Sequence, residues 1–281
     1  MGDAVADDKR NGGKGIRVVI VRVIENEENK KSIVLLCSNG DSTRAVYQAL
    51  KERFGDVTVI MEEDVPRSLF LKRRLKKLGF FSVFGQALFM MTVVPILRSL
   101  SQKRLDELKK DLKVTEIENA IHIDSVNSES GREKLRKVNP KVVVVNGTRI
   151  IGKETLQCVN AKFINMHAGI TPLYRGVHGG YWALAEGKPN LVGTTVHFVD
   201  TGIDTGNIIG QVFFEAAKGD NFAIYPYLHT KAGIPLLVKT VEMALVENLN
   251  INEKEPALPS KLRYHPTIWE YFYYLIKHGV K

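Results

Sequence analysis

The residues with the clearest potential for chemistry lie in one stretch of the chain, residues 163–211. Asn165 and His167 are two positions apart at the end of an apolar run, and Asp204 follows in a glycine-rich turn. Taken singly, a histidine after a strand is more often structural than catalytic, and an aspartate in such a turn is usually a turn former. Positions i and i+2 of a strand share a face, so the amide and the imidazole are expected to face one pocket. The carboxylate, one helix and one strand later, can return to the same edge of the sheet, so the combination predicts one active site.

The elements that must position these residues follow from the hydrophobic pattern. The run 141–145 contains four consecutive valines, and the run 32–37 has the composition of a strand buried on both faces of a parallel sheet. Strands are predicted over 16–23, 32–37, 57–61, 120–123, 141–145, 161–166, 193–199 and 208–214, and helices over 45–54, 67–77, 103–112, 130–138, 180–185 and 235–247. We therefore expect an α/β protein with a doubly wound, mostly parallel, Rossmann-like sheet, whose ligands bind at the carboxyl ends of the strands.

Length and composition bound the class of protein. A chain of 281 residues, 44% hydrophobic and 25% charged, has room for one large domain and a modest appendage. The predicted units are a disordered tail over 1–15, a catalytic domain over 16–248 and an aromatic-rich extension over 249–281. The tail is polar and lacks an apolar core, so neither a signal peptide nor an anchor is expected. Two cysteines are too few for a disulfide framework or a zinc cluster, which predicts a reducing cytoplasm and no metal site.

The formal net charge is +9, which favours an anionic partner, although an excess of surface lysine explains it equally well. Six of the cations lie in the predicted helix over 67–77, and twenty residues without a charge follow over 78–97. The uncharged segment is long enough for a membrane span, but it contains Gln86, two glycines and Pro95. A buried helix or a subunit interface is the favoured interpretation. Shallow insertion into an anionic leaflet through 67–97, helped by the basic flank, is the alternative, and a true span is the third.

A second candidate binding feature is the turn that follows the strand over 32–37. Ser38, Asn39 and Gly40 lie between this strand and a predicted helix. Free backbone N–H groups at such a helix N-terminus can bind a phosphate. The turn lacks a full glycine fingerprint, so a plain helix cap remains the alternative.

The stretch around the predicted active site resembles the folate-dependent formyltransferases. That family carries an Asn-x-His followed by a segment ending in proline and a distal Asp-x-Gly, here Asn165, His167, Pro172 and Asp204 to Gly206. The resemblance is specific from about residue 142 to 211 and weaker from 32 onward. One departure is Gly169-Ile170-Thr171 before the proline, where the family commonly has Ser-Leu-Leu. This difference changes the floor of the site and leaves the identity of the amine acceptor open.

The resemblance implies transfer of a formyl group from 10-formyltetrahydrofolate to a primary amine. Asn165 and His167 would donate hydrogen bonds to the developing oxyanion, and Asp204 would favour the imidazolium and take up the surplus proton of the amine. No metal is required. The resemblance also implies that the pterin of the donor contacts two loops, through residues Thr148, Arg149, Ile150, Val199, Asp200 and Thr201. A solvated surface charge is the alternative for Arg149.

The acceptor predicted from the resemblance is a small anionic amine, with a nucleotide-linked amino sugar favoured. Methionyl-tRNA formyltransferases add a C-terminal barrel, whereas 77 residues follow Asp204 here; glycinamide ribonucleotide transformylases lack the extension before residue 32 and the aromatic tail. Basic and aromatic residues are not interleaved, so no nucleic acid is expected. Sugar-nucleotide formyltransferases have short C-terminal additions and often dimerise, so a homodimer is expected. The predicted acceptor-binding residues are Ser38, Asn39, Gly40, Tyr174 and Arg175.

Two other functions stay open at this point. A non-catalytic doubly wound module could bind a membrane surface or nucleic acid through residues 67–77, and it would not depend on His167. A hydrolase could release formate from the same donor, with water in place of the amine.

Overall fold

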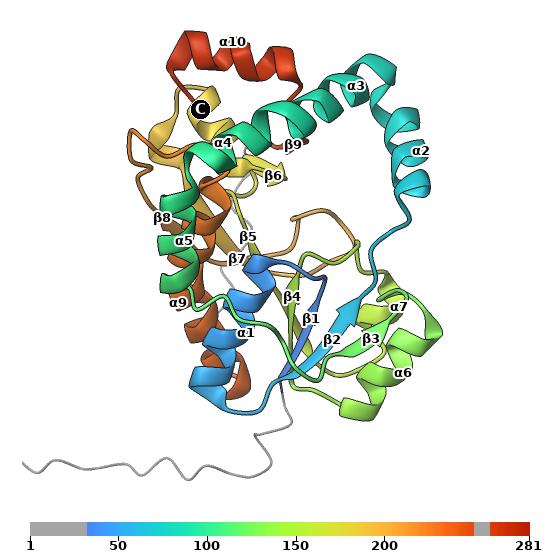
Figure 1. The fold of residues 1–281 in the computed structure, drawn as a ribbon. Coiled ribbons are helices and arrows are strands. Elements are labelled where there is room, and N and C mark those ends of the chain that lie inside the picture. The colour runs from blue at the N-terminus through green and yellow to red at the C-terminus, as the bar shows by residue number, and fades with distance from the viewer. Residues whose placement is uncertain (1–32, 250–258) are drawn as a thin grey trace, which may run out of the picture.

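The protein was analysed as a computed structural model, which describes residues 33–249 and 259–281. Within these residues a seven-stranded sheet has the order β3-β2-β1-β4-β5-β7-β8 (Figure 1). The five strands β1 to β5 are parallel, and β7 and β8 pair antiparallel at one edge. The strands are β1 (Ile33–Cys37), β2 (Thr58–Glu62), β3 (Ile121–Ile123), β4 (Val142–Asn146), β5 (Lys162–His167), β7 (Gly193–Phe198) and β8 (Ile208–Phe213). The predicted fold class is confirmed. The predicted tail over 1–15 and strand over 16–23 lie outside the described residues.

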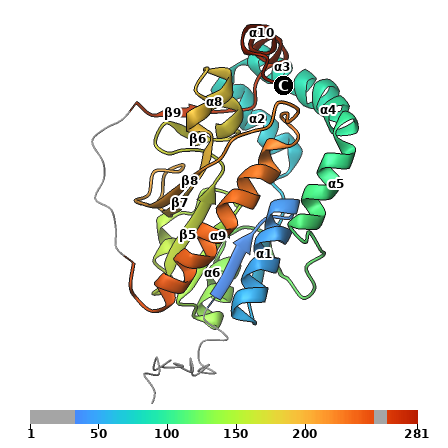
Figure 2. The ribbon, with the colours of Figure 1, turned by 90° about the vertical axis from the view of Figure 1, so that its left-hand side faces the viewer.

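Helices cover both faces of the sheet, which is why strands β1 and β4 at its centre are apolar at nearly every position. On β1, Leu35 packs toward one layer and Leu36 toward the other, and both are completely buried. One layer contains α1 (Asp41–Phe54) and α9 (Tyr225–Leu245), and the other contains α6 (Glu129–Val138) and α7 (Lys153–Leu156) (Figures 1 and 2). This doubly covered sheet leaves the carboxyl ends of its strands as the place where ligands can enter.

Helix α9 corrects one prediction, because it begins ten residues before the predicted start of 235. Pro235 lies inside the helix, where it removes one backbone hydrogen bond. The helix packs on β7, β8 and α1 along its length, and this burial outweighs the local cost of the proline. Three short elements were also absent from the prediction: α7, and the parallel pair β6 (Tyr174–Gly176) and β9 (Lys261–Arg263).

The basic and uncharged segments form an arm of helices, whose first part stands away from the sheet in Figure 1 and whose last helix packs beside α9. Its parts are α2 (Arg67–Leu78), α3 (Phe80–Leu88), the π-helical turn η2 (Phe89–Val93), α4 (Val94–Leu100) and α5 (Gln102–Asp111). The continuous helix Phe80–Leu100 is long and apolar enough to cross a membrane, with a mean hydropathy of 1.9, and 39% of its apolar window is buried.

One side of this helix belongs to the protein core. Val94 and Leu97 are buried beside α8 (Gly179–Ala185), and the Phe89 ring contacts Tyr271 of α10 (Ile268–His278) at 5.0 Å between centroids. The aromatic-rich helix α10 therefore packs back on the fold. The favoured interpretation of 78–97 as a buried helix holds for this side of the helix, while its other side is exposed.

Candidate active site

The predicted catalytic residues meet at one edge of the sheet. Asn165 and His167 lie at the carboxyl end of β5, and Asp204 lies in the turn between β7 and β8. Nδ1 of His167 is 3.3 Å from Oδ2 of Asp204. An amide and an imidazole from one strand and a carboxylate from a later turn thus face one cavity.

Asp204 is held in place by strand β6. The backbone N–H of Gly176 donates a hydrogen bond to Oδ2 of Asp204 at 2.8 Å, and the Arg175 side chain donates to the carbonyl of Ile203 at 3.1 Å. Asp204 has φ 51°, a left-handed conformation that aspartate and asparagine adopt more readily than most residues. The turn therefore aims the carboxylate at His167 before any ligand binds.

His167 is buried and both of its ring nitrogens have partners. Nε2 lies 2.7 Å from the carbonyl oxygen of Tyr174, so this nitrogen carries the proton and donates it, which leaves Nδ1 facing Asp204. Burial lowers the pKa of His167, and the negative charge of Asp204 opposes this shift. Burial alone would raise the pKa of Asp204, but the nearby imidazoles of His197 and His167 and the hydrogen bond from the Gly176 N–H hold this pKa below its usual value. At neutral pH the pair is a neutral imidazole beside a carboxylate, with room for one more proton between them.

His197 is a fourth polar residue of the site, and it was not among the predicted site residues. It lies on β7 directly opposite Asn165 of β5. Its Nδ1 donates to the carbonyl of Phe198 at 2.7 Å, so its Nε2 accepts a hydrogen bond from the Asn165 amide at 3.1 Å and lies 3.7 Å from Asp204. This contact orients the Asn165 amide, because only the N–H end of the amide can donate to a ring acceptor. The predicted strand over 193–199 contained the residue, but the antiparallel pairing with β5 could not be read from the sequence.

The four residues line a cavity of about 630 Å³, a volume in the range of small-molecule sites. The two loops predicted to contact the donor both border it, because its lining includes Thr148, Arg149, Ile150, Val199 and Asp200. Thr201, predicted with them, is not in the lining.

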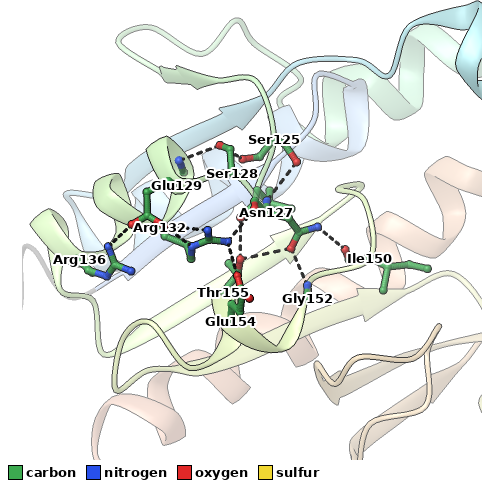
Figure 3. A network of polar contacts seen from close by, with 12 residues as sticks. Ser125, Asn127, Ser128, Glu129, Arg132, Arg136, Ile150, Gly152, Glu154 and Thr155 are labelled. Atoms are coloured by element: carbon green, nitrogen blue, oxygen red, sulfur yellow. Dashed lines mark hydrogen bonds and ion pairs between the residues drawn. The ribbon is translucent and has the colours of Figure 1, made fainter.

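A polar network fixes the loop that contains Thr148 to Ile150 (Figure 3). Asn127 is its centre: the side-chain amide donates to the Ile150 carbonyl at 2.9 Å and accepts from the Gly152 N–H at 2.7 Å. Thr155 donates to the Val126 carbonyl at 3.0 Å, which holds the segment of Asn127 against α7. The loop is thus attached to the neighbouring helices before a ligand arrives.

Arg149 is tied to the same loop rather than solvated freely. Its backbone N–H donates to Oε2 of Glu62 at 2.9 Å, and its guanidinium donates to the Glu63 carbonyl at 2.8 Å. The Glu62 side chain is 3% exposed, and Arg149 Nε lies 3.4 Å from its Oε1. The guanidinium therefore neutralises a buried carboxylate beside the cavity, and this is a structural use for the charge.

The residues predicted to bind the acceptor lie outside the lining of the cavity. Ser38, Asn39 and Gly40 are not in the lining of the cavity, whereas Ser42, the second residue of α1, is. Tyr174 donates to Glu186 at 2.9 Å and Arg175 to Ser260 at 2.7 Å. Neither Tyr174 nor Arg175 is in the lining; both hold strand β6, which in turn holds Asp204.

Further lining residues were not identified from the sequence. Five of the seven histidines line the cavity: His178, His229 and His265 in addition to His167 and His197. Nε2 of His178 lies 2.8 Å from Nδ1 of His265, so one ring donates to the other. Arg74, from α2 of the arm, also borders the cavity and donates to Gln86 at 3.0 Å. These residues come from elements far apart in the sequence, and no local motif marks them.

Comparison with known proteins gives one family match. The model of a family described as formyl transferase matches residues 20–226, which is more than half of the chain. The methionyl-tRNA formyltransferase of Caldicellulosiruptor saccharolyticus is 36% identical over 111 residues. That match covers 39% of this chain and 35% of the relative, so the chain spans about a third of that protein's length.

Solved structures share the fold at low identity. An N-formyltransferase from Helicobacter canadensis, solved in complex with folinic acid and dTDP-3-aminofucose, is 16% identical with a TM-score of 0.52, covering 82% of this chain and 70% of its own. Glycinamide ribonucleotide transformylase 1 from Symbiobacterium toebii is 18% identical with a TM-score of 0.52, covering 79% of this chain and 91% of its own. At these identities the likeness is one of fold.

Proposed function

The chain belongs to the formyl transferase family, and on that premise we propose that it transfers the formyl group of 10-formyltetrahydrofolate to the primary amine of a nucleotide-linked amino sugar. The observation that carries the proposal is the contact of His167 with Asp204 beside Asn165 at the cavity. A cavity of about 630 Å³ with two loops at its edge suits a donor with a flat pterin ring and a second, polar substrate.

Some residues of the site stabilise negative charge, and others accept a proton. The Asn165 amide, oriented by His197, donates a hydrogen bond to the formyl oxygen as negative charge develops there. The attacking nitrogen forms the new C–N bond and gives its surplus proton to the pair of Asp204 and His167, which has room for one. The bond from the formyl carbon to N10 of the folate then breaks, and that nitrogen takes a proton back. The additional donation from His167 to the formyl oxygen stays a prediction, since both of its ring nitrogens already have partners.

An amino sugar on a nucleotide is the acceptor that the charge and the fold favour. The Helicobacter canadensis structure with folinic acid and dTDP-3-aminofucose has this fold, and a formal charge of +9 suits an anionic acceptor. Methionyl-tRNA is the second candidate, because the sequence relatives with the higher identity are methionyl-tRNA formyltransferases. Their match covers less than half of their length.

The test is turnover of 10-formyltetrahydrofolate, followed by absorbance, with a panel of amines. The panel contains free amino sugars, dTDP-linked amino sugars, glycinamide ribonucleotide and methionyl-tRNA, and the matched blank contains no amine. Turnover that requires a nucleotide-linked amino sugar and is lost in His167→Ala supports the proposal. Equal turnover without amine, with release of formate, would show a hydrolase instead. Near-normal rates in His167→Ala would refute the assigned roles.

A further inference from the structure

The arm carries an unusual exposed surface, here called the apolar face. It lies on the side of the helix Phe80–Leu100 opposite the core, and Phe81, Met91 and Leu100 are 78%, 75% and 79% exposed. Its exposed large side chains are Phe80, Phe81, Phe84, Met91, Ile96 and Leu100. Soluble proteins seldom leave so many large apolar side chains together on one helix without a partner for them.

Helix α10 continues this surface at the same end of the molecule (Figures 1 and 2). The Trp269 indole packs directly on Gly85 of α3, where a Cβ atom would lie 2.2 Å from the ring, so the two helices touch. Trp269 itself is 47% exposed, and Ile276 on the same helix is 85% exposed. Tryptophan and tyrosine beside an aliphatic surface are typical of a boundary between an apolar phase and water.

The flank of the apolar face is strongly cationic. Residues 65–105 contain nine lysines and arginines and no aspartate or glutamate. Helix α2 supplies six of these cations, contains no buried residue, and exposes Phe70 and Leu71 between them. In the part of the chain that the structure describes, no cation of α2 pairs with a carboxylate. A short helix with exposed basic and apolar side chains and few contacts within the chain is typical of a helix that binds an outside surface.

We propose that the apolar face and α2 dock this protein on an anionic lipid bilayer, with the helix Phe80–Leu100 lying in the plane of the membrane surface. The apolar side chains enter the boundary between headgroups and acyl chains, and the cations of α2 contact the anionic headgroups. A transmembrane orientation is incompatible with the fold, because it would remove Phe89, Val94 and Leu97 from the core.

Charge also decides between a bilayer and a second copy of the chain. A symmetric dimer through the apolar face would bring two such cationic segments together without an acidic group from either copy of residues 65–105. An anionic bilayer offers the opposite charge and an apolar phase at once. Arg74 of α2 borders the active cavity, so docking places one wall of this cavity near the headgroups.

The test is vesicle co-sedimentation of the full chain, with vesicles of phosphatidylcholine alone and of phosphatidylcholine mixed with phosphatidylglycerol. Binding to the mixed vesicles, weakened by salt, is expected. In Phe81→Glu/Met91→Glu the partition coefficient should fall roughly tenfold to a hundredfold, because an aromatic and an aliphatic anchor are lost. Val246→Glu, at a 72% exposed position at the far end of α9, is the control and should bind like the parent.

Neutralising the flank tests the charge part separately. In Lys72→Gln/Lys76→Gln, binding to mixed vesicles should fall about fivefold per lysine, with no change on phosphatidylcholine alone. No binding of the parent chain to mixed vesicles would overturn the proposal, as would equal binding by Phe81→Glu/Met91→Glu. A dimer in lipid-free buffer that dissociates in Phe81→Glu/Met91→Glu would assign the face to a second copy instead. Vesicle binding is measured without substrate. The docking proposal can therefore be wrong while the proposed formyl transfer is right, and the transfer can be wrong while the docking is right.

Discussion

The histidines around the cavity predict a loss of stability in mild acid. Burial lowers the pKa of His229 from 6.5 to about 3 and that of His265 to about 4, and burial also holds the pKa of His178 well below its usual value. In the unfolded chain each of these rings takes up a proton near pH 6.5, whereas in the folded protein it stays neutral until a much lower pH. Acidification therefore favours the unfolded chain.

The direction and the size of the change in the free energy of unfolding follow from proton linkage. Because the folded pKa values are depressed, this contribution to stability is complete above about pH 6.5 and is lost as the pH falls. Each pH unit below 6.5 costs about 1.4 kcal/mol per buried histidine until its folded pKa is reached. At about pH 5, His229 and His265 have each cost roughly 2 kcal/mol, and His178 adds to this. The total is a large part of the free energy of unfolding of an ordinary domain, about 5–15 kcal/mol.

The assay is urea unfolding followed by circular dichroism at about pH 7.5 and about pH 5. A fall of several kcal/mol in the free energy of unfolding is expected between the two. His229→Gln should reduce that fall by roughly 2 kcal/mol, since glutamine takes up no proton. His122→Gln is the matched control, because His122 is exposed. A parent protein with equal stability at both pH values, or the same pH dependence in His229→Gln, would refute the reasoning.

Three further substitutions test the division of roles in the site. Asp204→Asn should lower kcat/KM about 10²- to 10⁴-fold at unchanged thermal stability, because asparagine also tolerates the left-handed conformation but accepts no proton; retained activity would exclude the carboxylate as proton acceptor. Asn165→Ala should lower kcat about 10²- to 10³-fold, measured at saturating amine, and a change confined to KM would contradict a role in stabilising negative charge. Asn127→Ala should raise KM for the folate donor more than it lowers kcat, because it releases the loop in Figure 3 and touches no reacting atom; an effect on kcat alone would count against that loop as a donor contact.

The parts of the fold that local pattern determines were predictable. Strands β1 and β4 are apolar at nearly every position because both faces are covered, and this is visible as runs of valine, leucine and isoleucine. Asn165 and His167 could be placed in one pocket because the strand period fixes which side chains share a face. Asp204 could be added because the resemblance to a family marked its turn.

The parts that depend on pairing between distant segments were not predictable. His197 joins the site through the antiparallel register of β5 with β7, and no spacing in the sequence encodes a register. Tyr174 and Arg175 were predicted to bind the acceptor, yet they hold β6, whose partner β9 pairs with it from 87 residues later, Tyr174 opposite Lys261. The start of α9 was missed because burial against the sheet outweighs the local effect of a proline.

The segment from residue 259 onward bears on the position of Asp204, the proposed catalytic carboxylate. Strand β9 pairs with β6, and the N–H of Gly176 in β6 donates to Asp204. The fit at this point leaves no space, since Gly176 has φ 93° and a Cβ atom there would lie 2.3 Å from the Arg263 carbonyl. A displacement of β9 would therefore move β6, and with it the hydrogen bond that aims the carboxylate at His167. The pairing of β9 with β6 thus supports the position of the proposed proton acceptor, and it matters for the mechanism as well as for stability.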